Sequence, residues 1–116
     1  MPLPDDATRL RHILESARKA VRFAAGKRHS EDLVSDEVLF LAIVHLLGII
    51  GEAAAGVSDE FKTGHPEIPW RQMTATRNRL IHGYFDVEPR LVWETVVTDL
   101  PVLIKRVQAV IEGQAR

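Results

Sequence analysis

Apolar residues recur every three or four positions along most of this chain, which is the spacing of an amphipathic helix. The first such run consists of Leu10, Ile13, Leu14, Ala17, Val21 and Ala24. Gly26 supplies a stop, so we predict a helix from about Asp5 to Ala25. No segment alternates between apolar and polar residues as a half-buried β-strand does.

A second helix is predicted to begin after Ser35 or Asp36, either of which can cap it, and to run to about Ala55. A short turn over residues 31–34 precedes it. From Val38 to Ile50 this helix is apolar on almost every side. Such a helix lies at the centre of a bundle or has a face covered by another protomer, and we expect both.

The remaining sequence predicts two further helices. A short capped turn at 58–61 and a loop stiffened by Pro66 and Pro69 precede a third helix, from about Pro69 to Gly83. After a turn near Phe85, helical spacing resumes over 91–107, where Pro101 is expected to kink or interrupt the helix. The fold class is therefore all-α: an antiparallel, up-and-down bundle of four or five helices forming one domain over residues 1–116.

Composition narrows the class of protein. A chain of 116 residues, 46% hydrophobic and 27% charged, fits one ordinary domain, and a dimer interface would add apolar burial that a chain of this size lacks. The absence of cysteine excludes disulfides and thiol chemistry. The N-terminus lacks the pattern of a signal peptide, and His45 and Glu52 break the longest apolar run, so we expect a cytoplasmic protein without a membrane span.

One segment exceeds the needs of folding: residues 77–84, Arg-Asn-Arg-Leu-Ile-His-Gly-Tyr. From Trp70 to Phe85 the chain has no acidic residue, although the whole molecule carries 15 Lys and Arg against 16 Asp and Glu. The basic residues of this segment are Arg71, Arg77, Arg79 and His82. A local positive field of this kind favours a partner that bears phosphate.

The spacing within this segment resembles the signature of the HepT-like ribonuclease toxins of the HEPN superfamily. Arg77 is followed by Asn78, then by His82 five residues on and Tyr84 two further. The likeness covers nearly the whole chain, including the stretches 9–14, 50–54, 66–70, 92–94 and 99–101. It implies a helical bundle that acts on RNA.

The chemistry of metal-independent RNA cleavage can be assigned to this motif. Such cleavage needs a base for the 2′-hydroxyl, an acid for the leaving oxygen and cationic support for the phosphate. One histidine cannot easily hold both protonation states, but a symmetric dimer, or a higher homo-oligomer, presents two copies of His82, one neutral and one protonated. Arg77 would bind phosphate through its planar fork of donors. The two side chains are about 140° apart around a helix, which also favours a site built from two helices across a dimer axis.

Four further residues are candidates for supporting or substrate-binding roles. Asn78 would hold His82 or a phosphate oxygen, and Tyr84 would contact the RNA backbone or stack on a base. Arg79 is as easily a solvated helix charge as a phosphate ligand. Glu52 is predicted to orient Arg77. His45 and Glu52 share one helix face, where a core histidine and a Glu bonded to an arginine are a better explanation than a metal site with only two ligands.

The resemblance also implies regulation. HepT-like toxins pair with a minimal nucleotidyltransferase antitoxin of the MntA type, in what is called a type VII-like pair, and the antitoxin adenylylates the tyrosine that corresponds to Tyr84. No cofactor is expected. Two alternatives remain at this point: a catalytically silent module that binds a nucleotide or phosphate, and a purely structural bundle that dimerises through the second helix.

Overall fold

Local signals in the sequence mark several of the helix ends. The computed structural model describes the backbone of residues 4–82 and 87–114, and the side chains of residues 5–80 and 87–113. Helix α1 (Pro4–Ala24) ends before Gly26, whose φ of 88° is the left-handed conformation that suits glycine. The short α2 (Ser30–Val34) follows. Asp36 then caps α3 (Glu37–Gly56) by accepting a hydrogen bond from the backbone N–H of Leu39 at 3.1 Å.

The second half of the chain continues the pattern. Ser58 caps α4 (Asp59–Gly64), and a loop leads to α5 (Trp70–His82). Three consecutive elements then form one continuous helical run: α6 (Pro89–Glu94), the π-helical turn η2 (Thr95–Asp99) and α7 (Leu100–Gln114). The predicted all-α class and helix positions are confirmed for the described residues, while the expected turn near Phe85 lies outside them.

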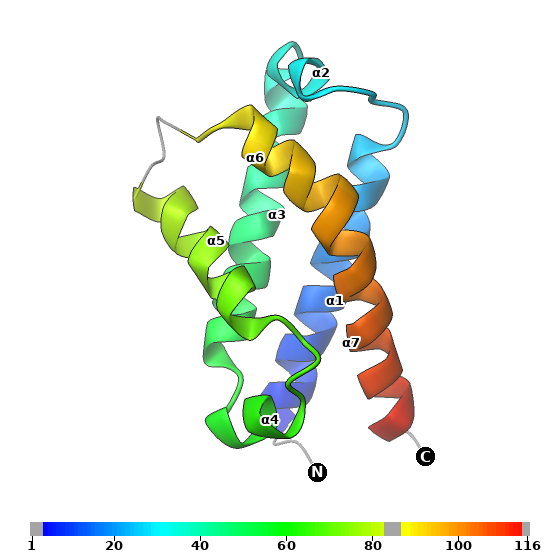
Figure 1. Cartoon of the computed structure of the whole chain (residues 1–116), viewed down its shortest axis with the longest axis vertical. Coiled ribbons are helices and arrows are strands. Elements are labelled where there is room, and N and C mark those ends of the chain that lie inside the picture. The colour runs from blue at the N-terminus through cyan, green and yellow to red at the C-terminus, as the bar shows by residue number, and fades with distance from the viewer. Residues whose placement is uncertain (1–3, 83–86, 115–116) are drawn as a thin grey trace.

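The arrangement of the helices makes α3 the centre of the bundle. Helix α1 packs against α3 and α7, α5 packs against α3, and α2 rests on α6. Figure 1 shows α3 running between α5 on one side and α1 on the other, with α2 and α4 at opposite ends. The largest fully buried side chains come from α1, α2, α3, the α4–α5 loop and the last helical run, and are Leu10, Ile13, Leu33, Ile43, Ile68, Val92, Val96 and Val107.

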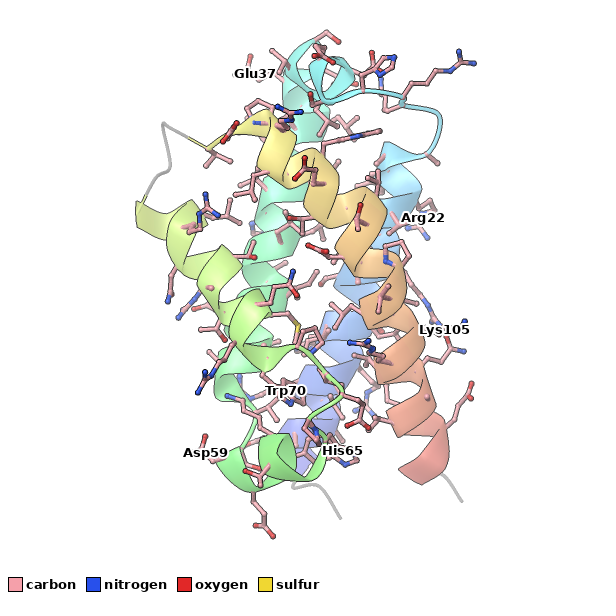
Figure 2. All side chains as sticks on the ribbon, in the orientation of Figure 1. Arg22, Glu37, Asp59, His65, Trp70 and Lys105 are labelled. Atoms are coloured by element: carbon pink, nitrogen blue, oxygen red, sulfur yellow. The ribbon has the colours of Figure 1, made fainter. Side chains whose placement is uncertain are left out.

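Two polar clusters fix the end of the bundle that carries α4. Asp6 of α1, only 2% exposed, accepts hydrogen bonds from the backbone N–H of Ser58 at 2.9 Å and from its hydroxyl at 2.7 Å. The indole N–H of Trp70 donates to the carbonyl of His65 at 3.0 Å, and the two residues lie close together beside α4 (Figure 2). Because Trp70 is the first residue of α5, this contact sets where α5 enters the bundle.

Pro101 deforms its helix without interrupting it. A proline ring collides with the carbonyl four residues back, and proline has no N–H to donate. The wider turn η2 ends at Asp99, two residues before Pro101, and the N–H of Leu100 donates to the carbonyl of Thr95, five residues back. The predicted kink or interruption is thus realised as a π-helical turn within an unbroken run from Pro89 to Gln114.

Asp99, the last residue of η2, makes stability depend on pH. Burial raises the pKa of its carboxyl, and the negative charge of Glu94 adds to the effect. A carboxyl with a raised pKa in the folded state stabilises the fold below the usual pKa of aspartate, and this contribution is lost as pH rises through the raised value.

We therefore expect Asp99→Asn to increase the free energy of unfolding at pH 7, because the amide carries no charge. Its oxygen can still accept the hydrogen bond that Gln72 donates to Asp99 at 3.0 Å. Urea unfolding measured from pH 3 to pH 8 checks this. The gain should vanish at the acid end, and a gain independent of pH would contradict the assignment to Asp99.

Candidate active site

The candidate site lies where α5 crosses α3, and the crossing depends on a glycine. A Cβ atom built on Gly51 would stand 2.8 Å from the carbonyl oxygen of Met73 and 2.9 Å from Cγ of Arg77, and it would meet the Cβ of Arg77 more closely still. Only a residue without a side chain lets the two helix backbones approach this closely. The absence of a side chain at Gly51 therefore lets Arg77 pack directly against α3.

Arg77 reaches across α3 toward Glu52. Its Nη1 lies 3.7 Å from Oε1 of Glu52, with the Arg77 side chain 23% exposed and the Glu52 side chain 74% exposed. The predicted contact between Glu52 and an arginine of the third helix is confirmed. At 3.7 Å this is an ion pair without a hydrogen bond, and one partner is well solvated, so its contribution to stability is about 1 kcal/mol or less.

The guanidinium of Arg77 is not saturated by the protein. Its Nε atom is buried and has no hydrogen-bond partner among the described residues. A buried donor without a partner costs free energy, which a turn of the side chain toward a ligand would recover. Arg77 also borders a hollow of about 250 Å³ between α3 and α5, whose lining residues are Val44, His45, Gly48, Ile49, Glu52, Arg77 and Leu80.

The structure corrects the prediction for His45. We expected a satisfied core histidine, but His45 is exposed and lies on the wall of this hollow. The helix is apolar on so many sides that its sequence does not reveal which side faces its neighbours. Among the described residues, no three His, Asp or Glu side chains gather closely enough to hold a metal ion.

The other motif residues fall in different places. Asn78 and Arg79 are both exposed, and Asn78 borders a separate open hollow of about 310 Å³ on the outer side of α5, with Lys62 and Arg71. His82 is the last residue of α5, but its side chain lies outside the described residues, and so does the whole of Tyr84. The fold thus brings Arg77 and Glu52 together in one protomer and places Asn78 on another face, while the roles assigned to all six residues stay predictions.

The exposed side of α3 adjoins the hollow at Arg77. Val38 is 81% exposed and Leu41 47% exposed, and further along the same face come His45, Gly48 and Glu52. The spacing of three and four residues makes this a continuous stripe on one side of the helix.

Helix α3 is also long and apolar enough to cross a membrane, judged by length and composition alone. Of that stretch, 39% is buried inside the bundle. Central helices of soluble bundles meet the same criterion of length and composition.

Comparison with known proteins decides the family. The family described as "Ribonuclease HepT-like" matches residues 13–110, which is most of the chain. The chain belongs to the HepT-like ribonuclease family. The match confirms the resemblance to the HepT-like family, and the helical bundle is the HEPN-like fold expected from it.

Three relatives show how far the likeness extends. "Putative RNase TTE0752" of Caldanaerobacter subterraneus subsp. tengcongensis is 38% identical over 90% of this chain and 93% of its own length. "Probable ribonuclease HepT" of Thermococcus cleftensis is 47% identical over 63% of this chain and 66% of its own length. "Putative RNase MJ1380" of Methanocaldococcus jannaschii is 35% identical over 84% of this chain and 89% of its own length. No solved structure matches the chain significantly.

Proposed function

We propose that this HepT-like protein is a metal-independent endoribonuclease toxin that cleaves RNA in the cytoplasm at a site built by two protomers. The observation that carries the proposal is the unsaturated guanidinium of Arg77 at the edge of a hollow beside the exposed apolar stripe of α3. Family membership supports the reaction class, and the position of Arg77 beside the hollow supports phosphate binding there.

The exposed stripe on α3 supports a homodimer as the working unit. An isologous contact across a two-fold axis would cover Val38 and Leu41 of both copies, and the small Gly48 permits close approach of the two helices. The hollows at Arg77 of the two protomers would then lie at the edges of one interface. The two copies of α5 would bring both His82 residues to the same composite site.

The reaction follows from the proton balance. A neutral His82 takes the proton of the 2′-hydroxyl, whose oxygen forms a bond to phosphorus while the bond from phosphorus to the 5′-oxygen breaks. The protonated His82 of the second copy gives its proton to that leaving oxygen. Arg77 neutralises the charge that builds on the phosphate oxygens. The products are a 2′,3′-cyclic phosphate and a free 5′-hydroxyl.

Regulation by modification completes the proposal. A nucleotidyltransferase antitoxin would adenylylate Tyr84, two residues after His82, and the added phosphate would occupy the positive field that otherwise attracts RNA. The same field supports the second candidate function, a silent module that binds a nucleotide or phosphate through Arg77 without turnover.

The decisive experiment is RNA cleavage by protein whose intact mass shows an unmodified Tyr84, with a chelator present. We expect cleavage that survives chelation and ends in a 2′,3′-cyclic phosphate. Binding of RNA without cleavage, over a range of cellular RNAs, would overturn the ribonuclease proposal and favour the silent module.

A further inference from the structure

The hollow beside Arg77 shares part of its lining with a second hollow that reaches helix α1. This second hollow, of about 280 Å³, lies between α1 and α3, and it shares Ile49 and Glu52 with the first. Its lining residues are Arg9, His12, Ile49, Glu52 and Ala53. Since α1 and α5 flank α3 (Figure 1), the two hollows lie on either side of the shared residues Ile49 and Glu52, and we refer to the pair as the groove.

Arg9 lies at the α1 end of this groove and, like Arg77, has a buried Nε atom without a hydrogen-bond partner among the described residues. Its guanidinium lies against Gly56, where an added Cβ would meet Nη1, Cζ and Nε of Arg9. Its Nε atom is buried without a hydrogen-bond partner, and Arg9 forms no ion pair within the part of the chain that the structure describes.

Arg9 and Arg77 share a feature that is rare in folded proteins. In the described residues, the buried side-chain nitrogen and oxygen atoms without a partner are the Nε atoms of Arg9 and Arg77, and no others. Such atoms are uncommon because each costs free energy, and a native structure that keeps one calls for a ligand or another cause. Here both belong to guanidinium groups that border one groove.

We propose that Arg9, together with His12, forms a second phosphate-binding subsite that holds the RNA backbone next to the phosphate bound at Arg77. The inference rests on the proposed ribonuclease function. The family match covers residues 13–110, so Arg9 and His12 lie just before it.

The chemistry of the groove fits a single RNA strand. A guanidinium fork pairs with phosphate oxygens, and His12, exposed and one turn further along α1, can donate to a second phosphate oxygen or a 2′-hydroxyl. Ile49 offers an apolar surface between the two arginines. The carboxylate of Glu52, which borders both hollows, repels a phosphate placed directly on it, and therefore separates two anion positions.

The test measures binding separately from cleavage. A short single-stranded RNA with 2′-O-methyl groups lacks the attacking hydroxyl, so it reports affinity alone. Arg9→Met keeps much of the apolar stem of the side chain but removes the guanidinium that lies against Gly56, and with it the charge. We expect about tenfold weaker binding, and a plot of log affinity against log salt whose slope is shallower by about 0.7, the value for one phosphate contact on a single strand.

Arg11→Met is the matched control, because it makes the same change of charge on the same helix. Arg11 is exposed and lies about 200° around α1 from Arg9, so it faces away from the groove. We expect it to leave affinity and salt slope unchanged. Gly56→Ala adds a test of position: it keeps every charge but displaces the Arg9 guanidinium, and should weaken binding with the salt slope largely kept.

The outcomes separate the two proposals. Equal losses for Arg9→Met and Arg11→Met, or no loss for Arg9→Met in folded protein, would overturn the subsite even if the parent cleaves RNA. A parent that binds the oligonucleotide through Arg9 but never cleaves natural RNA would support the subsite and overturn the ribonuclease. Failure of the parent to bind at low salt would overturn the subsite as well.

Discussion

Replacing His82 with alanine is expected to lower the rate of RNA cleavage by at least about 10³-fold, since general acid and base catalysis each contribute about 10²-fold to 10⁴-fold. In the proposed dimer the single substitution removes both groups, because one copy of His82 serves as base and the other as acid. His82 is the last residue of α5. The melting temperature of the variant, measured alongside, shows whether a lost rate comes from the chemistry or from the fold.

A subunit-mixing experiment tests whether one site needs both histidines. Parent and His82→Ala chains are mixed in equal amounts, allowed to exchange, and assayed at constant total protein. If each site needs two copies of His82, only parent homodimers cleave, and activity falls to about a quarter of the parent value; sites complete within one protomer would retain about a half.

Arg77→Lys is the companion variant, since lysine keeps the charge but not the planar fork of donors. We expect it to retain binding of the non-cleavable RNA while losing most of the cleavage rate.

A His82→Ala protein that cleaves as fast as the parent, with the same products, would show that the motif is not the site of the chemistry.

The helix boundaries were predictable because their causes are local. Gly26 ends α1 with a positive φ, while Asp36 and Ser58 each accept a hydrogen bond from a backbone N–H three residues on, and these signals lie within a few residues of the boundary they set. Pro101 was a local signal of a different kind. Its residue type predicts a disturbance, but packing around 95–99 decides between a kink, a break and a π-helical turn.

The composition of the groove was not predictable from the sequence. Arg9 and Glu52 are more than forty residues apart in the chain, and nothing in either segment indicates that α1 and α3 turn these side chains toward one hollow. The sequence around Arg9 hardly indicates a binding role, since it shows only a charged residue directly before Leu10, which is buried. The prediction that His45 lies in the core is wrong for a related reason: a helix that is apolar all around does not show which side stays exposed.

Gly51→Ala is expected to destabilise the fold by about 1–3 kcal/mol, the usual range when atoms are added to a well-packed contact. The added methyl group would collide with the Met73 carbonyl and with Cβ and Cγ of Arg77. A backbone atom and a Cβ cannot turn aside as the tip of a side chain can, so α5 must move away from α3. Helix α5 packs chiefly on α3, so few other contacts resist that movement.

The same displacement should reduce cleavage in the molecules that remain folded, because Arg77 is seated by this crossing. The measurements are urea unfolding and RNA cleavage at a temperature well below the melting point of the variant. Gly113→Ala in α7 is the control, since a Cβ there meets nothing within 4 Å and should leave both quantities near their parent values. If Gly51→Ala matched this control in stability and activity, the close crossing at Gly51 would not be what positions Arg77.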